Sequence, residues 1–345
     1  MAISPQMLEA LTTRGAERGV DVRPGIALVE QRLRTAIEAD LPVLDETGRH
    51  LMDAGGKRFR PMLALLAGLL GGAPVTDDAL VDAGVIVELV HLSTLYHDDV
   101  IDAADVRRGT EAAHVKWSNT VAILTGDFLL ARASELSAAL GVEVTRLMAA
   151  TIAALCQGQI REVQGSREAG AHGLAPIAAD RDHYLTVIAE KTASLIGASC
   201  RLGGLLARLP REAVDALGTY GHHLGMSFQL ADDVLDIASE ETESGKAPGT
   251  DLREGVRTMP VLYALEAEGD DSDLAALLDH PTERNVNEAL EILRGHPAMA
   301  LARDDARLEA AKAKRSLRGF EGDHYPAAVL DGLVWLADYA SNRVG

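Results

Sequence analysis

Six segments rich in alanine, leucine and valine dominate the chain and restrict the folds open to it. They occupy residues 61–70, 77–103, 118–140, 142–166, 180–209 and 211–240. Each carries apolar residues at helical spacing, and no alternation of apolar and polar residues is long enough to require a sheet. Aromatic residues make up only 3% of the 345 residues, so small aliphatic side chains must fill the core between closely packed helices. We therefore predict an all-α fold.

The sequence contains no change of composition sharp enough to mark a second domain. We expect one large helical domain over residues 25–345, preceded by a flexible segment at 1–24. Residues 165–176 and 241–250 are rich in Gly, Pro, Ser and charge, which predicts loops. A helix N-cap is predicted at Thr76 or Asp77.

Charge and cysteine content exclude several classes of protein. The formal net charge of −19 argues against a nucleic-acid partner, which needs a basic surface. Cys156 and Cys200 are too few for a disulfide scaffold, and we expect both to be reduced and buried. The N-terminal residues lack an apolar core of signal-peptide length, and no window reaches about 18 uninterrupted apolar residues. We therefore expect a cytoplasmic protein without a transmembrane segment.

Two acidic motifs, "HDDVID" and "ADDVLD", lie on apolar segments that are predicted to be buried helices. On a helix, Asp98 and Asp102 project from one face, and Asp232 and Asp236 repeat that spacing. Carboxylates at buried positions need a cation. Mg²⁺ fits best, because it takes one or two carboxylates and bridges to phosphate oxygens. The two motifs therefore predict a pair of metal clamps that grip a diphosphate.

Basic residues occur in compact groups that suit the same ligand. Any one of them alone would be interpreted as a surface charge. The chain has only 33 basic residues against 52 acidic ones, so the grouping of basic residues beside glycines and an acidic motif indicates a binding site for an anion. The groups are Lys57, Arg58 and Arg60 in "GGKRFRP", Arg107 and Arg108 in "RRG", Lys191 in "EKTASL" and Lys246 in "GKAPG".

Six motifs together resemble one enzyme family. "GGKRFRP", "HDDVID…RRG", "GDFLLARA", "KTASL", "GMSFQLADDVLD" and "GKAPGTDL" occur in the order and approximate spacing of the trans-polyprenyl diphosphate synthases, over roughly residues 25–340. The resemblance implies one all-α domain of the isoprenoid synthase type, with helices around a deep central cavity, and a homodimer. It implies condensation of isopentenyl diphosphate with an allylic diphosphate, with typically three Mg²⁺ ions per site.

The resemblance also assigns roles to individual residues. The catalytic and metal-site residues are Asp98, Asp99, Asp102, Lys191, Asp232, Asp233 and Asp236, with Asp98, Asp102 and Asp232 as direct metal ligands. The residues that bind the allylic diphosphate are Arg107, Lys191, Thr192, Gln229 and Lys246. Those that bind isopentenyl diphosphate are Lys57, Arg60, His91 and Arg108.

The expected chemistry follows from charge. Metal ions with Lys and Arg stabilise the negative charge of the departing diphosphate without proton transfer. The double bond of isopentenyl diphosphate attacks the allylic cation, and in the family the departing diphosphate is thought to take the proton. No general base is therefore sought among the side chains. Phe228 and Thr192 are candidates to shield the cation.

The sequence departs from the family in "DLREGVRT". Val256 stands where a second lysine is frequent, and Arg257 beside it is a candidate replacement. Thr250 also replaces a frequently basic residue.

Product length is predicted from the residues one helical turn before Asp98. Ser93 and Thr94 are small there, which disfavours farnesyl-type products, and the first motif has no two-residue insertion. The wall that stops the chain then lies deeper, with Phe128, Leu129 and residues 62–70 as candidates. We favour a medium-to-long all-trans product such as a quinone side-chain precursor, with geranylgeranyl diphosphate as the alternative.

Three other classes of protein fit the sequence less well. A His-Asp phosphohydrolase would not explain the second acidic motif or "GGKRFRP". A class I terpene cyclase normally lacks the isopentenyl diphosphate site that Lys57, Arg60 and Arg108 predict. A non-catalytic partner subunit usually loses the acidic motifs, and both are intact here. The preferred starter, the exact chain length, the oligomeric state and the downstream pathway are not determined by the sequence.

Overall fold

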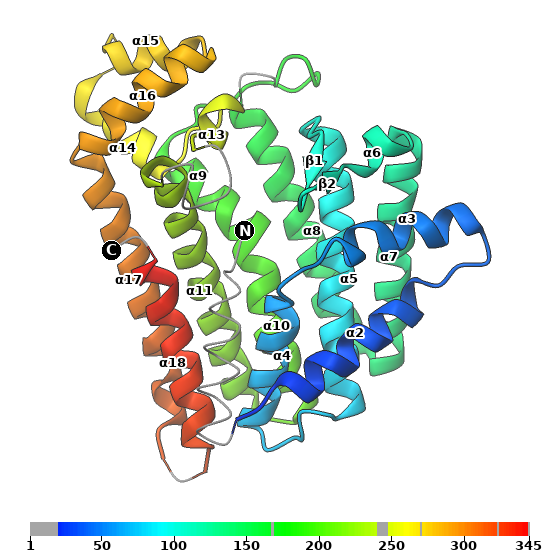
Figure 1. Ribbon diagram of the computed structural model, residues 1–345. Helices are drawn as coiled ribbons and strands as arrows, with labels where there is room; N and C mark the ends of the chain where they lie inside the picture. Colours follow the sequence, from blue (N-terminus) through cyan, green and yellow to red (C-terminus); the bar gives the residue numbers. More distant parts are fainter. Residues whose placement is uncertain (1–19, 167–168, 240–247, 270, 323, 344–345) are drawn as a thin grey trace.

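The computed structural model describes residues 20–166, 169–239, 248–269, 271–322 and 324–343, and within them the chain is almost entirely helical (Figure 1). The all-α prediction is confirmed for these residues. Strand structure within them is limited to the antiparallel pair β1 (Val106–Arg107) and β2 (Thr110–Glu111), in which Val106 faces Glu111.

The elements of the first half follow the predicted segments closely. They are α2 (Arg23–Ile37), α3 (Pro42–Asp53), α4 (Phe59–Leu70), α5 (Asp78–Ile101), β1 (Val106–Arg107), β2 (Thr110–Glu111), α6 (Ala113–Lys116), α7 (Asn119–Leu140) and α8 (Val142–Gly165).

The second half begins with one long helix that changes type in its middle. Its elements are α9 (Arg181–Ile188), the π-helical turn η1 (Ala189–Ala193), α10 (Ser194–Leu206), α11 (Arg211–Ala238), α13 (Thr250–Arg253), α14 (Met259–Glu268), α15 (Asp273–Asp279), α16 (Glu283–Gly295), α17 (Ala298–Ser316), the 3₁₀ turn η2 (Leu317–Phe320) and α18 (Ala327–Asn342).

Helix α5 begins where the sequence predicts. The Asp77 carboxylate accepts hydrogen bonds from the backbone N–H groups of Ala79 at 3.0 Å and Leu80 at 3.2 Å. It thereby satisfies two donors of the first turn, which have no partner within the helix. The cap fixes where α5 starts and so where its far end, which carries the first acidic motif, comes to lie.

The core forms around α10, which packs against α4, α5, α8 and α11. Helices α5 and α11 carry the two acidic motifs, so α10 connects the two helices that the site needs. Buried side chains in this region are small or aliphatic, and the fully buried Phe228 is one of few aromatic residues among them. The core is therefore filled mainly by small aliphatic side chains, as the low aromatic content predicts.

Within the described residues, one helix is long and apolar enough to cross a membrane, by length and composition alone. This helix is α5, and 72% of its most apolar stretch is buried inside the protein. Core helices pass the same test, so this finding gives only weak support for a membrane span.

One expectation about the cysteines is wrong. Cys200 is buried in α10, as predicted, but Cys156 is exposed on α8. Cys156 lies in an apolar segment, but the buried face of α8 is formed by residues that include Thr151, Leu155 and Gly158, and Cys156 lies outside that face.

Candidate active site

The first acidic motif lies at the end of α5. The backbone N–H of Asp102 donates to the carbonyl of Asp98 at 2.8 Å, so the two residues are one helical turn apart. Within the described residues, neither carboxylate makes a side-chain hydrogen bond or ion pair. Burial raises the pKa of Asp98 to about 6, against the opposing charge of Lys191. Negative charge at this point is therefore only partly compensated by the protein.

Asp99 lies on the other side of the same turn and has a different partner. Its side chain is fully buried, and Arg107 Nε donates to Asp99 Oδ1 at 2.5 Å. The second carboxylate oxygen has no hydrogen-bond partner within the described residues. Asp99 thus holds Arg107, which lies on β1, beside the motif.

Lys191 approaches the first motif from η1 and is paired with a residue that the sequence reasoning missed. Its ammonium group donates to the Glu162 carboxylate on α8. Burial lowers the pKa of Lys191, but Glu162 and then Asp98 outweigh burial and raise it. The sequence does contain a signal for Glu162, because it follows Leu155 and Gly158 at helical spacing on the buried face of α8.

The second acidic motif does not repeat the first one in its contacts. Asp232 Oδ1 forms an ion pair with Arg343 Nη2 at 2.7 Å. Arg343 follows α18 directly at the C-terminal end of the described chain. The sequence reasoning gave this arginine no role, since nothing in its local sequence indicates that it reaches α11.

Asp233 is buried within a chain of hydrogen bonds. Its carboxylate accepts from the Tyr184 hydroxyl and, at 2.9 Å, from Gln229 Nε2. Thr192 Oγ1 donates in turn to Gln229 Oε1 at 3.1 Å. Burial raises the pKa of Asp233 to about 7, which these two hydrogen bonds oppose. The contacts connect Asp233 to two residues predicted for the allylic diphosphate, Gln229 and Thr192.

Asp236 supports the neighbouring turn. Its carboxylate accepts hydrogen bonds from the backbone N–H groups of Thr250 at 3.2 Å and Asp251 at 3.1 Å, at the start of α13. The two motifs therefore share a spacing but not an environment.

Three of the four residues predicted for isopentenyl diphosphate, Arg60, His91 and Arg108, form a basic cluster near the start of α4, whereas Lys57 has Arg343 and Asp232 as its charged neighbours. Burial lowers the pKa of Arg60 to about 10, which still leaves the guanidinium charged at neutral pH. Burial, together with the charges of Arg60 and Arg108, holds the pKa of His91 well below its usual value. His91 is therefore neutral at pH 7. Burial likewise lowers the pKa of Lys57.

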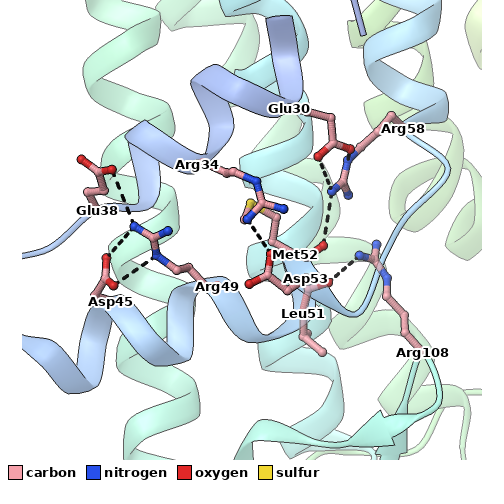
Figure 2. A network of polar contacts seen from close by, with 10 residues as sticks. All are labelled: Glu30, Arg34, Glu38, Asp45, Arg49, Leu51, Met52, Asp53, Arg58 and Arg108. Atoms are coloured by element: carbon pink, nitrogen blue, oxygen red, sulfur yellow. Dashed lines mark hydrogen bonds and ion pairs between the residues drawn. The ribbon is translucent and has the colours of Figure 1, made fainter. Parts of the chain in front are cut away.

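Arg58 stands within the same sequence motif and next to Arg108, but its guanidinium is paired with carboxylates. Its Nη1 donates to Glu88 at 2.8 Å, its Nε donates to Glu30 at 2.5 Å, and only 3% of the side chain is exposed. Figure 2 shows this guanidinium between Glu30 of α2 and the carbonyl of Met52, with Arg108 donating to the carbonyl of Leu51 at 2.8 Å. Arg58 is thus part of the support for the basic cluster.

The glycine pair of "GGKRFRP" makes this support possible. Gly55 has φ +97°, a conformation that favours glycine. A Cβ at Gly56 would meet Arg58 Nη1 at 2.4 Å and Arg108 Nη1 at 3.0 Å. Only glycine lets the two guanidinium groups approach the loop this closely.

The remaining predicted site residues lie outside the two acidic motifs and the basic cluster. Lys246 lies outside the described residues. Arg257 forms an ion pair of 3.9 Å with Asp279 of α15 and is 39% exposed, and its role as replacement for the lysine absent at Val256 stays a prediction. Ser93 is fully buried, and Thr94 donates to the carbonyl of His91 at 2.8 Å.

The residues present fit a divalent cation. Asp98 and Asp102 offer carboxylates with incompletely compensated charge, and oxygen ligands of this kind suit hard cations. Among the described residues no three His, Cys, Asp or Glu side chains gather closely enough to hold an ion by themselves. An ion here would complete its shell with water and phosphate oxygens, which is how Mg²⁺ is usually held.

Comparisons with known proteins identify the family of the chain. The polyprenyl synthetase family model matches residues 41–293. The nonaprenyl diphosphate synthase of Mycobacterium tuberculosis is 48% identical over 300 residues, which cover 86% of this chain and 87% of that protein.

Solved structures agree over nearly the whole chain. A decaprenyl diphosphate synthase from Rhodobacter capsulatus has a TM-score of 0.83 at 31% identity, covering 98% of this chain and 99% of that one. A polyprenyl synthase from Caulobacter crescentus CB15, complexed with calcium and isoprenyl diphosphate, has a TM-score of 0.84 at 31% identity, covering 97% and 98%. The expected isoprenoid synthase fold is confirmed, and the chain belongs to the polyprenyl synthetase family of prenyltransferases.

Proposed function

We propose that this prenyltransferase condenses isopentenyl diphosphate with an allylic diphosphate and repeats the step to give a medium-to-long all-trans polyprenyl diphosphate. The observation that carries the proposal is the environment of Asp98, a carboxylate whose pKa burial raises to about 6. The charges of Lys191 and Arg107 act on it, and these two side chains are held by Glu162 and Asp99. This arrangement of opposite charges suits an ion together with a diphosphate.

The chain's own side chains have distinct parts in the reaction. Arg107 and Lys191 stabilise the negative charge that develops on the departing allylic diphosphate. Arg60 and Arg108 hold the second diphosphate, while neutral His91 donates a hydrogen bond without adding charge. Divalent ions, when bound at Asp98, Asp102 and Asp232, supply further positive charge on the leaving group. Mg²⁺ and a count of three ions are part of this proposal.

The product length in the proposal rests on α5 and on the relatives. Ser93 and Thr94 are small, and Thr94 is only partly buried one turn below the first motif, so neither side chain is bulky enough to block a growing chain there. The nonaprenyl and decaprenyl synthases similar to this chain are named for long products. We therefore favour a product longer than geranylgeranyl diphosphate.

The homodimer is proposed on the exposed apolar side chains of two adjacent helices. Ile123 and Leu124 of α7 are 43% and 58% exposed, and Ile160 of α8 is 51% exposed. Residues of this size on neighbouring helices suit a contact with a second copy. Light scattering on the purified protein would measure its mass in solution. The cytoplasmic location stays a prediction.

The decisive experiment is turnover with defined substrates. Purified protein, Mg²⁺, isopentenyl diphosphate and allylic starters of five to twenty carbons are incubated, and the dephosphorylated products are separated by reversed-phase chromatography. We expect products longer than twenty carbons. A product that stops at twenty carbons would favour the geranylgeranyl alternative, cyclised hydrocarbons would favour a terpene cyclase, and no product from any starter would contradict the proposal.

A further inference from the structure

Asp232 forms a direct ion pair, which neither Asp98 nor Asp102 does within the described residues, although the charges of Lys191 and Arg107 act on both of them. Arg343 Nη2 lies 2.7 Å from Asp232 Oδ1, and the two side chains are only 12% and 18% exposed. The pair joins the residue after α18 to the second acidic motif on α11. It therefore connects two parts of the chain that are more than a hundred positions apart in sequence.

The guanidinium of Arg343 also packs against the ring of Phe228. Its carbon lies 4.3 Å from the centroid of Phe228, which is fully buried one turn before Asp232. A guanidinium over an aromatic face gains energy from the ring, and more so where water is excluded. Two independent contacts thus fix Arg343 at the Asp232 carboxylate.

We propose that Arg343 is an internal counter-ion of Asp232, which occupies the carboxylate when no metal is bound and competes with the divalent ion for it. The inference rests on the proposed function, in which Asp232 is a metal ligand. A carboxylate oxygen paired with Arg343 at 2.7 Å is not fully available to a cation. The metal must share that carboxylate with the guanidinium or displace it.

This competition gives the two motifs different metal affinities. At Asp98 and Asp102 an ion meets carboxylates without a hydrogen-bonded cation in the described structure. At Asp232 the same ion must first overcome an ion pair that is mostly shielded from water. Leaving one charge of such a shielded pair without its partner costs more than doing so in an exposed pair. The second motif is therefore expected to load last and to need the higher metal concentration.

The inference predicts the direction in which Arg343→Gln changes the affinity for a divalent ion. Mn²⁺ binding in the presence of inorganic diphosphate is measured by titration calorimetry and by the loss of the free-ion electron paramagnetic resonance signal. The proteins compared are the wild type, Arg343→Gln, Arg343→Lys and the control Arg211→Gln. Arg211 is 70% exposed and pairs with Glu143 on the surface, so the control removes the same charge far from the motif.

We expect the weakest Mn²⁺ site to bind roughly 5–150-fold tighter in Arg343→Gln than in the control, the usual range for coupled binding. Arg343→Lys keeps a competing charge and should stay within a few-fold of the wild type. Metal-free Arg343→Gln should also unfold at a lower temperature than the control, because Asp232 then lacks its partner.

Two failures are distinguishable. If the wild type binds Mn²⁺ and Arg343→Gln binds it no tighter, the competition is refuted while the proposed function stands. If no protein binds Mn²⁺ with diphosphate present, the proposed metal site fails, and the inference fails with it. Circular dichroism establishes that each variant is folded, and should Arg343→Gln not fold, tighter binding by Arg343→Lys would also refute the proposal.

Discussion

Replacing Arg58 with methionine tests whether this arginine supports the basic cluster, as its contacts indicate. Methionine keeps much of the volume but leaves Glu88 without its hydrogen-bonded cation. Glu88 is only 2% exposed, whereas Glu30, the other partner, is 34% exposed and stays hydrated. The free-energy cost therefore arises mainly at Glu88. Arg34→Met is the matched control, since Arg34 and its partner Asp53 are 49% and 50% exposed.

The size of the effect follows from burial. Removing one partner of a buried ion pair costs about 3–5 kcal/mol, and removing one partner of an exposed pair costs about 0–1 kcal/mol. The charges of Arg60 and Arg108 also act on Glu88, so we expect the lower end, about 3 kcal/mol for Arg58→Met. For a chain of 345 residues this lowers the melting temperature by about 4 °C.

Thermal and urea unfolding of the metal-free proteins measure the difference. Arg58→Met combined with Glu88→Leu should be more stable than Arg58→Met alone, because no buried charge is then left unpaired. Arg58→Met should also raise the KM for isopentenyl diphosphate more than the KM for the allylic starter. A stability loss no larger than that of the Arg34→Met control would refute the reasoning.

Three further outcomes are expected. Ser93→Phe should shorten the product, because a phenyl ring does not fit this fully buried position and must push into the neighbouring space one turn below the first motif; chromatography showing an unchanged chain length would place the wall elsewhere. In EDTA the protein should lose stability as pH rises from 5 to about 7.5, because the folded-state pKa values of Asp98 and Asp233, raised by burial to about 6 and about 7, exceed the ordinary value near 4. Such groups stabilise the fold below the unfolded pKa and cease to do so above the folded one, so Asp98→Asn should flatten the melting-temperature profile in that window; an equally steep profile would contradict the assignment. Glu162→Gln should reduce kcat by about 10–100-fold with little change in melting temperature, because Lys191 loses the carboxylate that holds it; normal kcat would show that Lys191 needs no such support.

Local sequence was sufficient to predict most helices and one end of the site. Asp77 caps α5 as expected, and the segment 77–103 became Asp78–Ile101 because helical spacing and the cap signal are both local. Asp98 and Asp102 lie one turn apart for the same reason. Periodicity and capping depend on residues a few positions away, so the sequence contains them directly.

The contacts that separate similar residues could not be predicted in this way. Arg58 and Arg60 stand two positions apart in one motif, yet only Arg58 is paired with Glu30 and Glu88, which come from other helices. Likewise, Asp232 and Asp98 have the same local pattern, and only tertiary packing brings Arg343 to one of them. Such differences depend on which helices meet, and helical periodicity contains no information about that.

The π-helical turn η1 has a consequence for how the long helix around it is used. A turn with one extra residue advances the chain by about 100° relative to a continuous α-helix. Before the turn, Tyr184 and Ile188 of α9 are buried with residues of α14 and α16; after it, Leu195 and Leu202 of α10 are buried with residues of α5. The extra residue works as a phase shift that lets the two halves of one helix face different parts of the core. A deletion of one residue within 189–193 would remove that offset, and one of the two halves would then turn its polar face to the interior.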